Sequence, residues 1–307
     1  MDGILIIDKP VGLTSHDVVA RVRRILKTKR VGHTGTLDPF ATGVMVVLVG
    51  KATRLAQFLD KDAKEYVAEV RFGFETDTGD RTGVRNAECE MRSAEIGAVI
   101  GGTDWDSVFG IFRGEIEQIP PMYSAKKIDG KKLYEHARKG NIIDRKAVKV
   151  TIHKLELLSE PSAVAGGLSR GVYDMTIRVH ASAGTYIRTL AEDIGRKIGT
   201  GAHLAELRRT RAGRFDLSRS ISLDELEKLD VPTTALIPMG EAVGHLSSIP
   251  LRADRVEKTK SGLSTRIAET QFTDGQPIRM LDESENLIAV GFYEETENCV
   301  RPKVVLV

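Results

Sequence analysis

The chain has 307 residues, of which 41% are hydrophobic and 29% are charged, and its formal net charge at pH 7 is +2. This length can hold one large domain with a small one, or two domains of ordinary size. No apolar run approaches the roughly 18 residues of a membrane helix, and the acidic start is unlike the basic start of a signal peptide, so we expect a cytoplasmic protein with no membrane contact.

The first segments of the chain predict a strand followed by a basic helix. Residues 3–7 are apolar, and after Asp8 they lead into a Lys-Pro-Val-Gly turn, so that residues 3–8 predict a strand. Thr14 and Asp17 then form a capping-box pattern that opens a helix with apolar residues on one face. Positions 21–30 carry six Lys and Arg residues and no acid. Such a cluster is either a solvated helix surface or a surface that contacts phosphates.

A glycine-rich loop is predicted over residues 32–39. Asp38 is the only acid between Val31 and Leu59, and the following Pro39 disfavours helical geometry for it. Two glycines would let a ligand approach the loop backbone closely. Asp38 is therefore a candidate nucleophile or base, although an ordinary Asx-turn explains the same residues.

A sheet is predicted from the segments that follow. Residues 43–50 have the pattern of a fully buried strand and residues 51–59 that of a short helix. Apolar side chains alternate with others over residues 66–74 and again over 172–180, which is typical of half-buried strands. Helices come irregularly between these strands. We therefore expect an α+β fold whose central sheet is mixed, mainly antiparallel and flanked by helices.

A helix is predicted after Gly184, with apolar residues at helical spacing from Ile187 to Ile198. Arg188 falls in its first turn, where a cation opposes the helix dipole. This position is explained if Arg188 meets an acid or a phosphate, and an exposed arginine without a partner is the alternative. An arginine beside Asp38 would lower the pKa of that carboxyl and hold it ionised.

Two further basic clusters and a change of composition complete the chain. Between residues 124 and 149 nine Lys or Arg face three acids, and a third cluster occupies positions 208–214. From residue 247 eight basic residues face ten acidic ones, and short apolar stretches are broken by Gly, Asp and Pro. We predict a small all-β domain over residues 247–307, after a first domain over residues 1–246. The three basic clusters together favour a nucleic acid as partner.

Patterns for other chemistries are missing from the sequence. It contains no phosphate-binding P-loop, no dinucleotide-binding fingerprint and no nucleophile elbow. Asp77-Thr78-Gly79 is similar to an aspartic protease motif, but that dyad needs two carboxylates and no second copy is present. The histidines lack metal-ligand spacing, and the two cysteines, Cys89 and Cys299, are far apart. We expect neither a metal nor a cofactor.

Four segments of the chain resemble, in order, the motifs of the TruB family of tRNA pseudouridine synthases. These segments are Gly3-Ile4-Leu5 with Asp8 to Ser15, Gly32 to Pro39, Gln118 to Arg138, and Ser182 to Arg188. Together they extend over about residues 3 to 215, and several motifs in order are far more specific than any one of them. The resemblance implies the pseudouridine synthase fold with a PUA-like C-terminal β domain and an RNA-contacting insertion at about 120–150.

The resemblance also implies an activity. Such an enzyme isomerises a uridine in the T-loop of tRNA, at position 55, to pseudouridine by base flipping, and it needs no cofactor. Asp38 would be the catalytic residue, and it could attack C1′, add to C6 or take the 2′ proton. The implied substrate-binding residues are His33, Tyr66, Tyr186, Arg188 and Leu207. The expected phosphate contacts are Arg21, Arg24, Lys126, Lys127, Lys131, Arg138 and Arg208.

Simpler interpretations of two of these residues stand beside the implied roles. His33 could bond within its own loop, and Tyr66 could be a core aromatic at a strand end. The resemblance instead implies that His33 occupies the place vacated by the flipped base. It implies that Tyr66 stacks on the uracil and provides the route by which the C5 proton leaves.

Two other functions are compatible with the sequence. One is a guide-RNA-dependent synthase similar to dyskerin, which works with protein partners. The start of the chain close to the first motif and the lack of lysine-rich tails favour instead a stand-alone bacterial type, a monomer without an obligate protein partner that binds the tRNA T-arm. The other is an RNA chaperone that remodels tRNA, with catalysis secondary.

Overall fold

The protein is described here from a computed structural model. The structure describes residues 1–86, 93–124, 126–128, 130–137, 140–141, 143–164, 172–267 and 272–307. In this part of the chain no helix combines the length and the apolar character that crossing a membrane requires.

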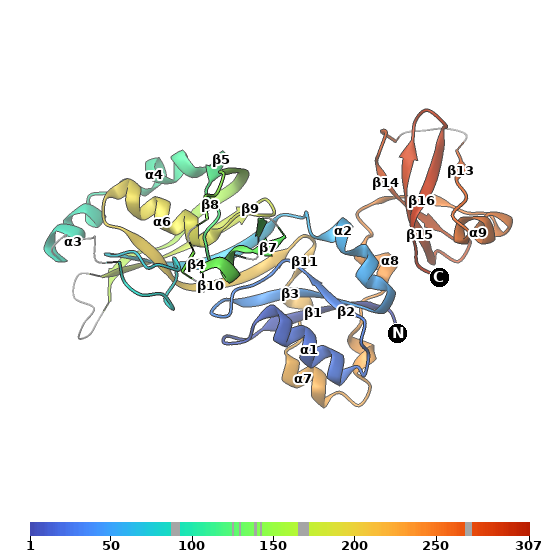
Figure 1. Cartoon of the computed structure of the whole chain (residues 1–307), viewed down its shortest axis with the longest axis horizontal. Coiled ribbons are helices and arrows are strands. Elements are labelled where there is room, and N and C mark those ends of the chain that lie inside the picture. Colours follow the sequence, from blue (N-terminus) through green and yellow to red (C-terminus); the bar gives the residue numbers. More distant parts are fainter. Residues whose placement is uncertain are drawn as a thin grey trace.

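One long nine-stranded sheet forms the body of the molecule (Figure 1). Its main path runs β1-β3-β10-β4-β9-β8-β5, with β2 paired to β3 and β11 paired to β10. Its strands are β1 (Gly3–Lys9), β2 (Val31–Thr34), β3 (Thr42–Val49), β4 (Lys64–Phe72), β5 (Gly114–Gln118), β8 (Val148–Ala163), β9 (Tyr173–Ala181), β10 (Ala202–Ala212) and β11 (Phe215–Asp216). Among the strand pairs that the structure describes in this sheet, β3 with β10 is parallel. The remaining pairs are antiparallel. The predicted mixed, mainly antiparallel sheet is confirmed.

Helices and their apolar side chains cover one face of this sheet. The larger hydrophobic core contains Val18 and Val22 of α1, Leu190 and Ile194 of α6, and the inward-facing residues of β4 and β9. The helices of this region are α1 (Ser15–Ile25), α3 (Ser93–Gly101), α4 (Trp105–Phe112), α6 (Ile187–Ile198) and α7 (Leu223–Lys228). The helix α1 begins with the predicted capping box: Thr14 accepts from the Asp17 backbone N–H, and the Asp17 side chain accepts from that of Thr14.

Three local predictions differ from the structure in their bounds. Residues 32–34 belong to strand β2 and not to a loop, because they pair with β3. The helix predicted over residues 51–59 is split into a 3-10 turn, η1 (Gly50–Leu55), and α2 (Ala56–Leu59). The strand predicted over residues 66–74 is β4, which runs from Lys64 to Phe72. The two residues before Tyr66 therefore also pair with the neighbouring strand.

A five-stranded sheet of order β12-β14-β15-β16-β13 forms the C-terminal end of the molecule (Figure 1). Its elements are β12 (Ser247–Pro250), α9 (Ala253–Lys260), β13 (Thr265–Arg266), β14 (Pro277–Leu281), β15 (Leu287–Glu294) and β16 (Cys299–Val305). The prediction that this segment is all-β is wrong for α9. Val290, Val304 and Leu306 share a second hydrophobic core with Ile4 and Val46 of the large sheet. This unit therefore packs directly against the strands that carry the N-terminus.

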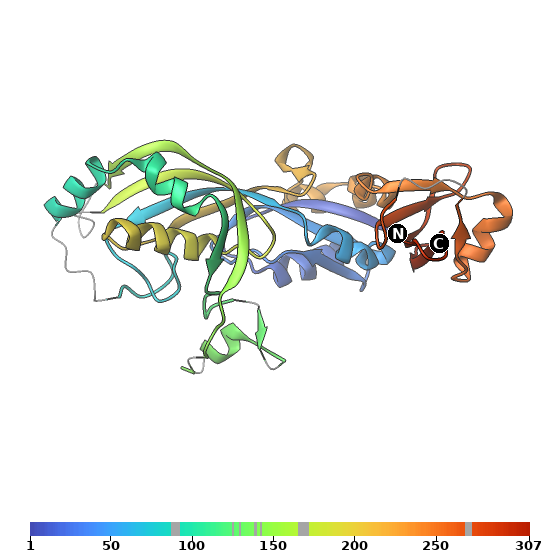
Figure 2. The same cartoon turned by 90° about the horizontal axis from the view of Figure 1, so that it is seen from above.

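The segment between β5 and β8 projects away from the large sheet (Figure 2). It contains the short hairpin of β6 (Lys127–Ile128) and β7 (Lys131–Lys132), followed by α5 (Leu133–Ala137). It leaves the sheet at the end of β5 and returns at the start of β8, since Gln118 pairs with Val148. The predicted insertion at about 120–150 thus coincides with a projecting part of the molecule.

Candidate active site

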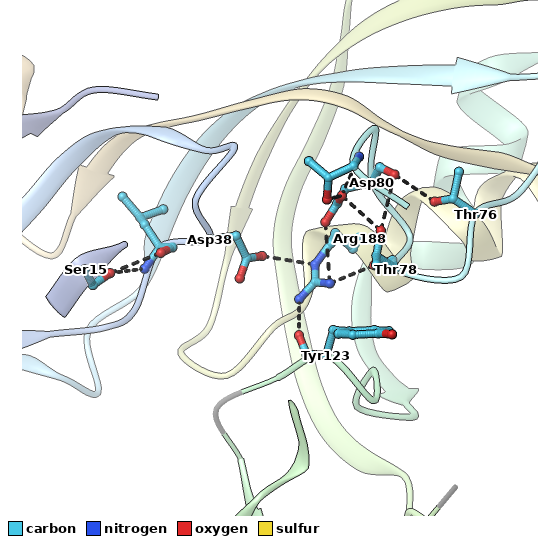
Figure 3. A network of polar contacts seen from close by, with 9 residues as sticks. Ser15, Asp38, Thr76, Thr78, Asp80, Tyr123 and Arg188 are labelled. Atoms are coloured by element: carbon cyan, nitrogen blue, oxygen red, sulfur yellow. Dashed lines mark hydrogen bonds and ion pairs between the residues drawn. The ribbon is translucent and has the colours of Figure 1, made fainter. Parts of the chain in front are cut away.

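Asp38, in the loop between β2 and β3, forms an ion pair with Arg188, in the first turn of α6 (Figure 3). Both residues line a cavity. The Nε of Arg188 lies 3.0 Å from Oδ2 of Asp38. The arginine side chain is 6% exposed and the aspartate side chain 34% exposed, so the carboxylate is the part of the pair that a ligand can reach. The cation in the first turn of the helix therefore has an acid as partner.

The guanidinium of Arg188 is fixed on its other sides by backbone carbonyls. Its Nη1 donates to Thr78 O at 2.7 Å and its Nη2 to Tyr123 O at 2.6 Å. Oδ2 of Asp80 lies 3.6 Å from Nη1 as a second, weaker ion pair. The four partners named here all come from outside α6. They hold the plane of the guanidinium with Nε directed at Asp38 (Figure 3).

Asp80 was not singled out in the sequence, and the structure gives it a clear place in the site. It is only 4% exposed, and its Oδ1 accepts from Thr78 Oγ1 at 3.0 Å, from the Thr82 backbone N–H at 2.9 Å and from Thr82 Oγ1 at 2.5 Å. These bonds close a tight turn whose Thr78 carbonyl binds Arg188. The turn-forming residues Asp77 to Gly79 were the only sequence signal, and they suggested a protease motif instead.

Burial raises the pKa of the Asp38 carboxyl, and the Arg188 guanidinium opposes that rise. Asp80 adds a smaller upward contribution to the pKa, and Lys9 a smaller downward one. Arg188 therefore acts in the direction expected from the sequence, but removal from water outweighs it. The pKa of Asp38 lies above its ordinary value, and the ion pair limits this increase.

The loop that carries Asp38 is held by helix α1. Ser15, in the first turn of that helix, donates its hydroxyl to Leu37 O at 3.1 Å and accepts from the Leu37 backbone N–H at 2.9 Å. The Gly12 backbone N–H donates to Pro39 O at 2.8 Å. The first motif of the chain thus supports the loop on both sides of Asp38. The side chain of Asp38 pairs with Arg188 and not with the backbone of its own loop, which argues against the Asx-turn interpretation.

A cavity of about 240 Å³ opens beside the carboxylate. Tyr66 of β4 and Leu207 of β10 line it with apolar surface, and Tyr186 lines it just before α6. The backbone of Tyr186 is tied to β5, because its N–H donates to Gln118 Oε1 at 3.0 Å and Gln118 Nε2 donates to its carbonyl at 3.3 Å. Burial raises the pKa of the Tyr186 hydroxyl, so that it stays protonated. The structure therefore brings four of the predicted substrate-binding residues to one cavity with Asp38: Tyr66, Tyr186, Arg188 and Leu207.

His33 lies on β2 and is half-buried. Its ring centroid is 6.0 Å from that of His16, with the rings edge to face. It is not among the residues that line the cavity within the described part of the chain. Its predicted role in replacing the flipped base stays a prediction.

The predicted phosphate contacts have different surroundings. Arg21 pairs with Asp224 at 2.5 Å and Glu227 at 2.7 Å, and Arg208 pairs with Asp8 at 2.7 Å. Arg24 is exposed on α1, and Lys126 lines the cavity beside Asp38. The backbone of Lys127 and Lys131 forms the projecting hairpin, and Arg138 lies outside the described residues. Contact with phosphate remains a prediction for all of them.

One group of side chains in the described part of the chain has ligand atoms close enough to hold a metal ion. It consists of Glu294, Glu297 and Cys299 in the C-terminal sheet. Arg301 already pairs with both glutamates, at 2.6 and 3.1 Å. The positive charge of Arg301 therefore occupies the place of a cation, and this cluster is a surface ion-pair network.

Known proteins match the chain over nearly its whole length. Residues 23–187 match the model of the TruB family pseudouridylate synthase N-terminal domain, and residues 188–243 match the tRNA pseudouridylate synthase B C-terminal domain. The tRNA pseudouridine synthase B of Geobacillus thermodenitrificans is 42% identical over 293 residues, covering 93% of each chain. That of Aromatoleum aromaticum is 47% identical over 258 residues, covering 82% of this chain and 77% of the relative.

The fold also matches solved structures. A chain in the crystal structure of a Cbf5-Nop10-Gar1 complex superposes with a TM-score of 0.71 at 29% identity, over 99% of this chain and 85% of the other. A chain in the structure of an H/ACA RNP bound to a substrate RNA containing 2′-deoxyuridine superposes with a TM-score of 0.70 at 26% identity, over 99% and 85%.

The fold and the match to the family define the class as pseudouridine synthase, an isomerase that acts on RNA. Within that class, the chain belongs to the TruB family of tRNA pseudouridine synthases. The family predicted from the order of the sequence motifs is confirmed.

Proposed function

We propose that this chain converts the uridine at position 55, in the T-loop of tRNA, into pseudouridine, with Asp38 as the catalytic residue. The observation that carries the proposal is the Asp38–Arg188 pair at the edge of a cavity lined by Tyr66, Tyr186 and Leu207. The cavity offers a carboxylate and apolar or aromatic surface, which suits a planar base that must be held while one bond is exchanged.

The reaction is an isomerisation and needs no oxidant or reductant. The N1–C1′ bond breaks, the uracil turns within the cavity, and C5 bonds to C1′. The proton on C5 then leaves, and N1 of the product takes up a proton. Asp38 acts by attack on C1′, by addition to C6 or by removal of the 2′ proton. Each of these three roles requires the ionised carboxylate, which the ion pair with Arg188 favours.

Tyr66 and Leu207 occupy adjacent strands at the cavity. In the proposed complex the uracil stacks on the Tyr66 ring, which gives the base a fixed plane in which to turn. The Tyr66 hydroxyl provides a route for the C5 proton. The hydrophobic Leu207 limits the access of water to the reacting carbon, since it is 8% exposed.

The target uridine lies within a folded loop and must leave its stack, at a cost of a few kcal/mol. His33 takes the vacated place. Positively charged residues of α1 and of the projecting segment between β5 and β8 bind phosphates of the T-arm, which weakens binding steeply with rising salt. The projection of that segment beside the cavity supports this arrangement, because Lys126 lines the cavity itself.

A stand-alone enzyme acting on tRNA is proposed over a guide-RNA-dependent one. The tRNA pseudouridine synthase B of Geobacillus thermodenitrificans shares 42% identity over 93% of the chain, whereas the chain of the Cbf5-Nop10-Gar1 complex shares 29%. In the proposal the protein acts as a monomer without an obligate protein partner.

Mapping of pseudouridine in a tRNA treated with the purified protein tests the proposal. An unmodified transcript should gain pseudouridine at position 55, and Asp38→Ala should abolish this while the affinity for tRNA changes less than tenfold. Full activity of Asp38→Ala would end the catalytic assignment. Product formed only after addition of guide RNA or other proteins would contradict the stand-alone proposal, and tight binding without product would favour a chaperone.

A further inference from the structure

Two buried cations line the catalytic cavity in addition to Arg188. Lys64 is the first residue of β4 and is 6% exposed, and Arg209 of β10 is 1% exposed. Both line the cavity of about 240 Å³ that contains Asp38. Neither residue was predicted from the sequence, where Lys64 lies in a short run of mixed charges and Arg209 belongs to a cluster expected at the surface.

Backbone carbonyls are the acceptors for both cations. Lys64 Nζ donates to Asp60 O at 2.6 Å and to Asp62 O at 2.5 Å. Arg209 Nε donates to Val44 O at 2.7 Å, and its Nη2 donates to Gly35 O at 3.2 Å. Within the described residues, no carboxylate oxygen lies within 4.0 Å of either charged group. Asp62 and Asp60 act on Lys64 only from beyond this distance. The two positive charges are therefore held in place by carbonyls and are only partly offset by carboxylates.

This arrangement is unfavourable for the protein alone. Burying a charge without an opposite charge in contact destabilises the folded state, and two like charges side by side add repulsion. The pKa of Lys64 is lowered by burial and, next, by the charge of Arg209, and the smaller opposing contributions of Asp62 and Asp60 do not cancel this decrease. An ammonium group has three N–H donors and a guanidinium five. The carbonyl bonds use two donors of each, so both groups keep donors for a further acceptor.

The two cations lie next to the surface proposed to hold the base. Lys64 and Tyr66 are two positions apart on β4, and Leu207 and Arg209 are two positions apart on the adjacent β10, where Arg209 is paired with Tyr66. Two residues along a strand correspond to roughly 7 Å, which is comparable to the span from the base to the phosphate of one nucleotide. A Cβ built on Gly35 would lie 3.4 Å from Arg209 Nη1 and 3.7 Å from Lys64 Cε, so both side chains border the loop that carries Asp38.

We propose that Lys64 and Arg209 form a subsite for a backbone phosphate adjoining the flipped uridine, so that one nucleotide is held at once by its base and by its charge. The inference rests on the proposed function for the identity of the base. The phosphate occupies the space between the two cations and supplies the direct anionic contact that neither cation has among the described residues. Binding of the correct nucleotide then also fixes Gly35, and through it the loop that positions Asp38.

A thermodynamic cycle between protein and RNA tests the proposal. The probe is a T-arm stem-loop RNA in which one phosphate is replaced by an uncharged methylphosphonate, either on the 5′ side or on the 3′ side of the target uridine. The dissociation constant is measured by fluorescence anisotropy for the wild type, for Lys64→Met and for Lys64→Arg. Lys258→Met, in the exposed part of α9, serves as the control variant. Thermal unfolding shows whether each variant is folded.

At one of the two positions the neutral phosphate should weaken wild-type binding about tenfold or more, as expected for a charge-assisted hydrogen bond. Lys64→Met should bind the unmodified RNA more weakly than the wild type does. Replacing the phosphate by methylphosphonate should then lower the affinity of this variant by less than a further threefold. Lys64→Arg and Lys258→Met should keep the wild-type sensitivity. The subsite is ruled out if neither neutral position affects the wild type, or if Lys64→Met remains as sensitive as the wild type.

The binding measurement is separate from activity, so the two proposals can fail independently. An intact coupling between Lys64 and one phosphate without any pseudouridine in the RNA would contradict the proposed function alone. Pseudouridine formed at position 55 without such coupling would contradict the phosphate subsite alone.

Discussion

The Nε of Arg188 contacts Asp38 at 3.0 Å while its two Nη atoms donate to the carbonyls of Thr78 and Tyr123. The guanidinium thus connects the catalytic loop with the turn closed by Asp80 and with the segment that follows β5. A lysine has the same charge but lacks the planar fork, so it cannot reach three acceptors in these directions. The geometry of Asp38 therefore depends on the shape of the arginine as well as on its charge.

Replacement of Arg188 by lysine should lower the rate of the chemical step by about 10²-fold or more, the effect expected when a positioned donor is lost. Two partly buried carbonyls also lose their donor, so the free energy of unfolding should fall by about 1–3 kcal/mol. Single-turnover kinetics and urea unfolding measure the two effects. Arg196→Lys, on the exposed side of the same helix, is the matched control and should keep wild-type turnover. A fully active Arg188→Lys would contradict the positioning role.

The acidic limb of the pH–rate profile should report Asp38. Burial raises its pKa, and catalysis needs the ionised form, so activity is full above the raised pKa and declines as the pH falls through it. This decline should begin at a higher pH than the ordinary aspartate value near 3.8 implies. Single-turnover rates measured over a pH series locate the limb.

Two substitutions should move this limb in opposite directions. Arg188→Gln removes the charge that lowers the pKa of Asp38, so the limb should shift to higher pH. Asp80→Asn removes a charge that raises it, so the limb should shift to lower pH, with a reduced maximal rate because the turn that binds Arg188 loosens. Equal positions of the limb in both variants would show that another group controls it.

Lys9 should make the stability of the protein depend on pH. Burial lowers its pKa from 10.5 to about 8. Between these values the unfolded chain keeps the proton that the folded chain has released, so the free energy of unfolding rises with pH through this window. Below about pH 8 the buried ammonium is charged, and it destabilises the folded state to its full extent. Compared with Lys9→Met, the wild type should therefore gain stability from pH 8 to pH 10. Chemical unfolding at several pH values measures the difference between the two proteins, and a difference that stays constant would contradict the assignment.

His33 should matter more for a folded substrate than for an open one. In the proposed function it fills the place of the extruded base, a role that exists only when the uridine starts within a stack. His33→Ala should slow modification of folded tRNA, with a smaller effect on a short unstructured RNA of the same sequence. Rates on both substrates are compared under single-turnover conditions. Equal losses on the two RNAs would argue against a role in extrusion.

Much of the fold could be predicted because its signals are local. The capping box of Thr14 and Asp17 begins α1 as expected, and alternation identified most of β4 and β9. The short turns of η1 and the helix α9 within the C-terminal sheet were missed. The pattern of residues 51–59 predicted a single helix without showing where it changes from 3-10 to α. Helix α9 lies in a segment whose apolar stretches resembled short strands.

Part of the candidate site could also be predicted from local sequence signals, and part could not. Asp38 and Arg188 could be singled out because each is unusual in its own segment: an isolated acid before a proline, and a cation in the first turn of a helix. Their meeting depends on how the first loop and α6 pack on one sheet, which residues so far apart in the chain do not reveal. Asp80 shows the limit of sequence reasoning: the protease-like motif beside it could be rejected from the sequence, but nothing there indicated that Asp80 pairs with Arg188.

Arg208 and Arg209 show why the sequence alone could not predict the surroundings of a charged side chain. In the sequence they are two adjacent members of one basic cluster. Successive side chains of a strand point to opposite faces, so Arg208 reaches Asp8 near the surface while Arg209 is buried against Val44 and Gly35. The order of the motifs was enough to predict the family, which is confirmed, and the local pattern singled out Asp38 as the candidate catalytic residue. Whether a given charge meets water, an acid or a ligand depended on the strand register and on the loops packed over the sheet, because solvation and ion pairing are set by neighbours distant in sequence.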